Sequence, residues 1–152
     1  MTKDDYRRIV VKIGTSSLMN EDSINLEMMH SLAAELSELR SSGKEAMLIT
    51  SGAIGFGMEK MKTGFPQNPV MRQAMAAIGQ SRLMHEYEKA FSSYGQVIAQ
   101  VLPTHQTFSN PQYFTPLRMA VEKLIELGAI PIINENDAVS AEEISGKAFS
   151  DN

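Results

Sequence analysis

The feature that most constrains the fold is the alternation of short apolar runs with longer segments of helical spacing. The apolar runs lie at residues 9–13, 46–49, 97–102 and 130–133. Runs of this length are typical of strands buried in a parallel sheet, and the segments between them are long enough to cross over the sheet as helices. The alternation predicts the α/β fold class, as a three-layer α/β/α sandwich with a mostly parallel sheet and right-handed crossovers.

Capping residues mark where the helices between these runs begin and end. Asn25 is an N-cap candidate before a helix that starts at Leu26, and Gly43 is a stop signal for it. A second helix is expected from Ala53 onward, and a third from Met71 toward Phe91.

A fourth helix is expected to open with Thr115-Pro116, as N-cap and first-turn residue, and to end at Gly128. The residues of this helix expected to face inward are Leu117, Ala120, Val121, Leu124 and Ile125. We see no repeat or linker that would divide these residues, so one domain is expected.

Composition excludes several function classes. The chain has 152 residues with a formal net charge of -4, which gives no basic surface for nucleic acid. It has no cysteine, so disulfides and thiolate chemistry are excluded and a reducing, cytoplasmic location is expected. The polar N-terminus is unlike a signal peptide, and no apolar run approaches the roughly 20 residues of a membrane helix.

Ligands of open α/β sheets bind outside the carboxyl ends of the strands, so the loops there are the first candidates for a site. After the first apolar run, Lys12, Gly14 and Thr15 offer a charge, an accessible backbone and a hydroxyl, which together suit a phosphate. The same residues also suit a polar turn beside a lysine whose stem lies along the strand. The motif alone does not decide between a phosphate site and a polar turn.

Two further loops carry unusual residues. Thr50, Ser51 and Gly52 follow the second run at a helix start, where they suit either an anionic ligand or simple helix capping. The tract 134–137 (Asn-Glu-Asn-Asp) follows the fourth run and holds more carboxylates and amides than a turn requires. Here we favour a functional interpretation, in which the tract binds a substrate amine.

Other common motifs are missing. The sequence has neither the P-loop nor the dinucleotide-binding glycine pattern, and the protein-kinase signatures are absent too. The three histidines are far apart, so no residue is assigned as a metal ligand.

Taken together, four ordered motifs resemble those of the amino acid kinase family. They are V-V-K-I-G-T-S at 10–16, T-S-G-A-I at 50–54, A-I-G-Q-S-R-L at 77–83 and I-N-E-N-D-A-V at 133–139. Within the family, aspartate kinases resemble K-F-G-G and N-acetylglutamate kinases K-x-G-G in the first loop, whereas this chain has a threonine after its first glycine. That difference favours the branch that acts on glutamate.

The resemblance implies an amino acid kinase-like fold and transfer of the γ-phosphoryl group of ATP, with Mg²⁺, to the side-chain carboxylate of glutamate, an early step toward proline. It implies that Lys12 is catalytic and that the ATP phosphates contact Lys12, Gly14 and Thr15. Glutamate is implied to contact Ser51, Gly52, Asp137 and Asn152. The family motif around Asn152 resembles F-G-D-N-D, from which this chain departs at Ser150.

The resemblance also implies that residues 1–152 are the amino-acid-binding N-terminal part of a kinase domain. The ATP-binding half, with a second catalytic lysine, and any RNA-binding-like extension would follow residue 152, so the 152 residues alone are expected to be inactive. Expected partners are glutamate, ATP, proline as a feedback inhibitor and further copies in a homo-oligomer, with no nucleic acid and no membrane. Alternatives are another small-acid kinase of the family or a non-catalytic amino-acid-sensing module.

Overall fold

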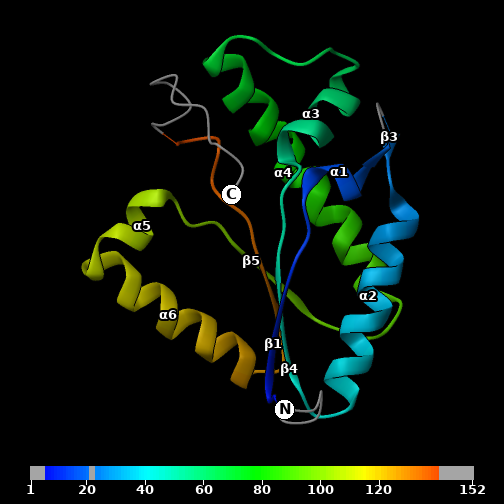
Figure 1. Ribbon diagram of the computed structural model, residues 1–152, viewed down its shortest axis with the longest axis vertical. Helices are drawn as coiled ribbons and strands as arrows, with labels where there is room; N and C mark the ends of the chain where they lie inside the picture. The colour runs from blue at the N-terminus through cyan, green and yellow to red at the C-terminus, as the bar shows by residue number, and fades with distance from the viewer. Residues whose placement is uncertain (1–5, 21–22, 141–152) are drawn as a thin grey trace.

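The central element is a four-stranded parallel sheet. The computed structural model describes residues 6–20 and 23–140, and in it the strands are ordered β1-β4-β6-β5 (Figure 1). Their bounds are Arg8–Lys12 for β1, Glu45–Ile49 for β4, Ile98–Val101 for β5 and Ile130–Ile133 for β6. Each lies within one residue of the predicted apolar run, so the α/β prediction is confirmed.

The carboxyl ends of the four strands lie in one row. Lys12 pairs with Ile49, and Ile133 pairs with Ile49 on one side and Val101 on the other. Backbone bonds continue just past this row, from Thr50 N to Ile133 O at 2.9 Å and from Asn134 N to Val101 O at 3.1 Å. The loops that follow β1, β4 and β6 therefore begin side by side.

Helices cover both faces of the sheet. The α-helices are α1 (Thr15–Leu18), α2 (Leu26–Ser41), α3 (Ala53–Met61), α4 (Pro69–Ser92), α5 (His105–Ser109) and α6 (Pro111–Glu126). In Figure 1, α6 lies on the opposite side of the sheet from α2. A two-stranded antiparallel pair, β2 (Met19–Asn20) and β3 (Ser23–Ile24), joins α1 to α2 and was not predicted.

The capping predictions for α2 are confirmed. The Asn25 side chain accepts a hydrogen bond from Met28 N at 3.0 Å, which satisfies one of the free donors at the start of the helix. Gly43 follows the last turn with φ of +84°, a conformation that glycine adopts without a Cβ penalty.

Helices α3 and α4 cross at very short range because both present glycine at the contact. A Cβ on Gly79 would stand 1.7 Å from Ala53 O, and one on Gly57 would stand 2.0 Å from Met75 O. No other residue type fits either position unless the helices separate. Gly57 and Gly79 are therefore what allow α3 and α4 to lie so close together.

The predicted start of α6 at Thr115-Pro116 is wrong. The helix begins at Pro111, where Asn110 accepts a hydrogen bond from Gln112 N at 3.0 Å, and Pro116 lies inside it. Asn110-Pro111 carries the same cap-and-proline signal five residues earlier. A helix that starts there already includes Pro116. Of the residues expected to face inward, Val121 and Ile125 are buried, but Ala120 is exposed.

The core lies between the sheet and the helices α2 and α4. Its largest fully buried members include Tyr87, Phe91, Leu83, Leu48, Leu36 and Ile132. The face toward α6 is covered less completely, and the expectation that β1 is a buried strand fails there, since Val10 is 50% exposed. Within the described ranges, no helix has both the length and the apolar character needed to cross a membrane.

Candidate active site

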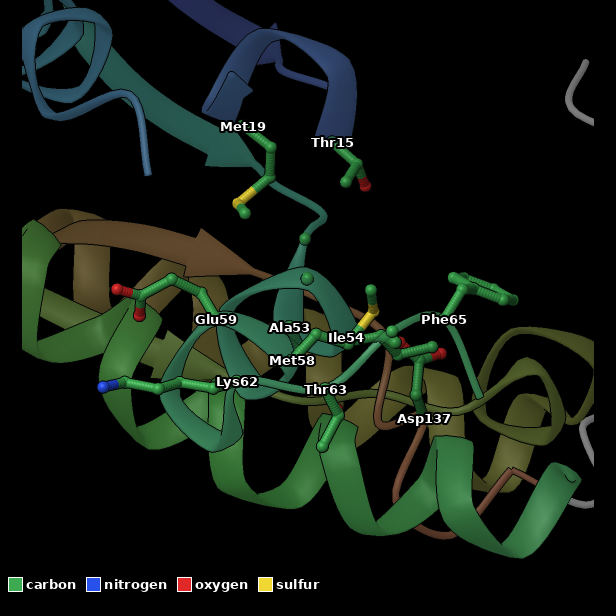
Figure 2. A pocket seen from close by; sticks show the side chains of 13 residues that line it. Thr15, Met19, Ala53, Ile54, Met58, Glu59, Lys62, Thr63, Phe65 and Asp137 are labelled. Carbon is green, nitrogen blue, oxygen red and sulfur yellow. The ribbon is translucent and has the colours of Figure 1, made fainter. Parts of the chain in front are cut away.

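A pocket of about 770 Å³ opens at the carboxyl end of the sheet (Figure 2). Its walls come from the segment after β1, from α3 with the loop that follows it, and from the turn after β6. The lining residues are Thr15, Met19, Gly52, Ala53, Ile54, Gly55, Met58, Glu59, Lys62, Thr63, Gly64, Phe65 and Asp137. Three chain segments that are far apart in the sequence thus enclose one cavity.

The structure brings together three of the predicted site residues and leaves three others outside the lining. Thr15, Gly52 and Asp137 line the pocket, as their positions after strand ends predicted. Gly14 and Ser51 each lie next to a lining residue in the chain, and Lys12 ends β1 three residues before Thr15, but none of the three is part of the wall. Asn152 lies outside the described residues.

The start of α3 supplies backbone donors to the pocket. Gly52 is the N-cap with φ of +101°, a left-handed conformation that explains why glycine stands here, and its nearest neighbours would tolerate a Cβ at 3.8 Å. It has no side chain to cap the helix, and the next three residues, 53–55, line the pocket. The first N–H groups of a helix lack partners within the helix, so they are available to an anionic group.

Lys12 ends β1 on the face of the sheet that α6 covers in part. Its side chain is exposed, and within ranges 6–20 and 23–140 it has no hydrogen bond or ion pair to another residue. Gly14 caps the short helix α1, and a Cβ placed on it would meet nothing within 4 Å. The loop therefore places the Lys12 ammonium, which has no partner among the described residues, near the accessible backbone of Gly14, and this combination suits a phosphate.

The Thr50 hydroxyl is not available to a ligand, although the sequence placed it among the candidate site groups. Thr50 is 3% exposed, and its Oγ1 lies 2.8 Å from the hydroxyl of Tyr87 on α4. Burial raises the pKa of Tyr87 to about 12, and the hydrogen bond to Thr50 opposes part of that rise. The pair joins the end of β4 to α4 and is structural.

The tract after β6 divides into a buried, structural residue and a half-buried part that reaches the pocket. Asn134 is 5% exposed, and its Nδ2 donates to Oε1 of Gln80 on α4 at 2.7 Å. Our expectation that the whole tract faces a substrate is therefore wrong at its first residue. Asp137 lies in the turn three residues later and lines the pocket (Figure 2).

Sequence reasoning missed the apolar wall of the pocket. Met19, Met58 and Phe65 line it, and Arg72 lies over the Phe65 ring at 6.0 Å from its centroid. Met19 lies on the short strand β2, Met58 on α3 and Phe65 in the loop between α3 and α4, and none of the three carried a site signal in the sequence.

Glu59 and Lys62 bring charge to the far rim of the pocket. Glu59 Oε2 lies 3.6 Å from Arg82 on α4, which also approaches Glu86 at 3.8 Å. Lys62 ends α3 with φ of +53°, a conformation that is strained for a residue with a side chain. The pocket thus combines backbone donors, a carboxylate and an apolar wall, which suits a small molecule with an ammonium and a carboxylate at different ends.

The fold and these motifs agree with the comparisons with known proteins. The model of the amino acid kinase family matches residues 7–152, and the chain belongs to that family. A solved structure, UMP kinase from Ureaplasma parvum, shares the fold with a TM-score of 0.51 at 17% sequence identity, over 84% of this chain and 55% of that one.

Curated relatives narrow the resemblance. The chain is 46% identical to the glutamate 5-kinase of Caldanaerobacter subterraneus over 90% of its own length and 37% of the relative's. It is 44% identical to that of Methanococcoides burtonii, covering 92% of the chain and 38% of the relative. It is 46% identical to the glutamate 5-kinase of Listeria innocua, over 91% of the chain and 51% of the relative. The chain therefore spans between about two fifths and half of these relatives.

Proposed function

We propose that this chain is the amino-acid-binding part of a glutamate 5-kinase, which transfers the γ-phosphoryl group of ATP to the side-chain carboxylate of L-glutamate. The observation that carries the proposal is the pocket in which Asp137 and the uncapped start of α3 line the same cavity (Figure 2). A carboxylate can bind the substrate ammonium, and helix N–H groups can bind a substrate carboxylate. The relatives named above support glutamate as the amino acid.

In this proposal two groups of residues have separate tasks. Ser51, Gly52, Asp137 and Asn152 bind glutamate. Lys12, Gly14 and Thr15 bind the phosphates, and Lys12 is catalytic because an ammonium can stabilise charge on the transferring group. The glutamate side chain has a pKa of about 4.3 in water, so it is already an ionised nucleophile near neutral pH and needs no general base.

The residues near Lys12 fit a nucleotide phosphate, because the space over Gly14 is open and Lys12 has no partner among the described residues. ATP would supply the phosphoryl group, and a bound Mg²⁺ would neutralise part of the charge of its phosphates. Within ranges 6–20 and 23–140 no cluster of three or more His, Asp or Glu side chains could hold a metal ion. Mg²⁺ in such sites takes phosphate oxygens of the substrate among its ligands.

We further propose that the rest of the ATP site lies in the part of the relatives that this chain does not span. The 152 residues alone would then bind glutamate but not phosphorylate it. Proline inhibition, homo-oligomerisation and a cytoplasmic location stay predictions.

The substrate assignment is tested by Asp137→Asn in the full-length protein that carries this chain. Loss of the carboxylate weakens a charge-assisted hydrogen bond, so we expect the KM for glutamate to rise about 10-fold or more with little change in the KM for ATP. Glu126→Gln, on the exposed side of α6, removes the same charge far from the pocket and serves as the control. Equal KM values for wild type and Asp137→Asn would exclude the role.

Substrate turnover separates the alternatives. Glutamate, aspartate and N-acetylglutamate are offered in parallel with ATP. Turnover of glutamate alone supports the proposal, turnover of another acid identifies a different kinase of the family, and saturable glutamate binding without any turnover identifies a sensing module.

The role of Lys12 is tested by Lys12→Ala and Lys12→Arg. If the ammonium acts mainly in the transition state, alanine lowers kcat by roughly 100-fold with little change in the KM for glutamate. Arginine keeps the charge but has a larger, planar head, so it restores little activity. A lysine that only covers the strand end predicts instead that both variants keep a near-normal kcat.

A further inference from the structure

Helix α4 carries the motif at 77–83, to which the proposed function gives no task. Yet this one helix contacts the carboxyl ends of three strands. Tyr87 bonds to Thr50 after β4, at 2.8 Å. Gln80 bonds to Asn134 after β6 at 2.7 Å and to Gln100 on β5 at 3.3 Å. The helix therefore sets the relative positions of the segments from which the pocket is built.

The bonds of Gln80 form a chain of defined polarity. Asn134 Nδ2 donates to Gln80 Oε1, and Gln80 Nε2 in turn donates to Gln100 Oε1. Asn134 is 5% exposed, so an amide that lost Gln80 could not fully replace it with water. The bond between Gln80 and Asn134 is thus the stronger link, and the outer bond to Gln100 is exposed to solvent.

A second glutamine on α4 contacts the other end of the same tract. Gln73 Nε2 donates to the backbone oxygen of Ser140 at 3.2 Å, and Ser140 is 4% exposed. Gln73 and Gln80 are seven residues apart, which places them on one face of a helix two turns from each other. The tract 134–140 is therefore attached to α4 at both ends, with Asp137 at its middle.

The residue next to Gln80 contacts the opposite wall of the pocket. Gly79 lies against the first turn of α3, since a Cβ on it would stand 1.7 Å from Ala53 O. Two consecutive residues of α4 thus touch the two walls: Gly79 touches the start of α3, and Gln80 touches the segment that carries Asp137. These neighbouring residues of α4 therefore help to set the distance between the two walls.

We propose that Gln80 is a positioning residue for substrate binding, which acts through Asn134 to place Asp137 opposite the start of α3, with Gln73 supporting the far end of the tract. The proposal rests on the proposed function in that the substrate is taken to be glutamate. Gln80 itself contacts no reacting atom and is not among the residues that line the pocket.

The test is Gln80→Met in the full-length protein, since methionine has a similar length but no amide. We expect the KM for glutamate to rise about 10-fold, while kcat and the KM for ATP change by less than about twofold. Gln100→Met is the matched control, because it removes only the outer bond; its KM for glutamate stays within about twofold of wild type. Gln73→Met is expected to raise the KM in the same direction as Gln80→Met.

A purely structural role predicts a different pattern, in which melting temperature falls and both KM values and kcat change together or not at all. If the KM for glutamate stayed within about twofold of wild type in both Gln80→Met and Gln73→Met, the proposal would be wrong. Should Gln80→Met fail to fold, Gln73→Met carries the test, since it leaves the buried Asn134 satisfied.

Hydrogen–deuterium exchange gives a readout that does not depend on the substrate. We expect the peptide that spans 129–140 to exchange faster in Gln80→Met and unchanged in Gln100→Met. If Gln80→Met exchanged faster but the parent protein did not turn over glutamate, the result would support the role of Gln80 in holding the tract 134–140. It would then count only against the proposed function. Unchanged exchange in Gln80→Met would overturn the positioning role, whatever the substrate.

Discussion

The two faces of the sheet are closed to very different degrees. On the face covered by α2 and α4, Leu48 of β4 is fully buried and packs in one cluster with Leu83 and Phe91. On the face toward α6, Val10 of the neighbouring strand β1 is 50% exposed, and Ile49 is 36% exposed. The same sheet thus has one completed layer and one partial layer.

The difference separates two tasks. The closed face carries the buried hydrogen bonds of α4, which hold the strand ends in a fixed relation. The open face presents Lys12, whose charge has no partner among the described residues. A group that must meet a ligand phosphate lies on the side with free space, whereas the groups that shape the pocket depend on the packed side.

The largest difference in the free energy of unfolding is expected between one substitution on the closed face and one on the open face. Leu48→Ala leaves a cavity in the closed core and should lower the free energy of unfolding by about 3 kcal/mol. Val10→Ala removes a half-exposed side chain and should cost less than about 1 kcal/mol. Urea unfolding of both variants measures the two values.

The outcome that would break the comparison is a similar loss for the two variants. A loss at Val10 as large as that at Leu48 would mean that the face toward α6 is covered in solution. An unchanged slope of free energy against urea in both variants is needed for this reading, because a changed slope would indicate a different unfolded or native state.

Most of the closed face could be predicted from the sequence, because its signals are local. Asn25, Gly43 and the four apolar runs set the element bounds through capping and spacing. That Thr15, Gly52 and Asp137 would lie around one pocket could be predicted, because strand ends in a parallel sheet share one edge.

The sequence-based predictions failed where the outcome depends on tertiary structure or on a choice between two equal local signals. An apolar strand such as β1 predicts burial on both faces, but whether both layers are complete depends on tertiary packing, so the exposure of Val10 was missed. The start of α6 was misplaced because Asn110-Pro111 and Thr115-Pro116 carry the same signal. Gln80 was missed because its partner Asn134 lies 54 positions away, and only the fold brings them together.

A smaller effect is expected at Tyr87, which tests the closed face by pH. Its pKa is raised to about 12 by burial, so the unfolded chain loses this proton first and stability falls as pH rises above the ordinary value of 10.0. By pH 11 this costs wild type about 1.4 kcal/mol. Tyr87→Phe loses the bond to Thr50, about 1 kcal/mol at pH 8, but has no such proton to lose.

The two proteins should therefore reach similar stability near pH 11, as followed by urea unfolding at pH 8, 10 and 11. Tyr94→Phe is the control, since Tyr94 is 46% exposed and its substitution should leave the pH profile unchanged. A constant difference between wild type and Tyr87→Phe across this range would mean that the Tyr87 hydroxyl is not buried in solution.

The smallest effect is expected within the open face itself, at the ion pair that joins α6 to the sheet. Arg8 of β1 donates to both oxygens of Glu122 at 2.7 Å and to Glu45 at 2.7 Å. The pKa of the Glu122 carboxyl is lowered mainly by its hydrogen bond to Arg8.

A carboxyl whose pKa is lowered in the folded state stabilises the fold above its ordinary pKa of 4.5, and this stabilisation is lost as the pH falls through the lowered pKa. Glu122→Gln should therefore lower the melting temperature slightly at pH 7 and by less at pH 3. At pH 7 the effect should be smaller in 1 M salt than at low ionic strength, because both side chains are exposed. Glu126→Gln, one turn further along α6, removes the carboxylate that pairs with Lys123 of the same helix and should change the melting temperature less at every pH. If Glu122→Gln lowered the melting temperature as much as Leu48→Ala, α6 would depend on this charge rather than on Val121 and Ile125, and the partial layer would be held by a single ion pair.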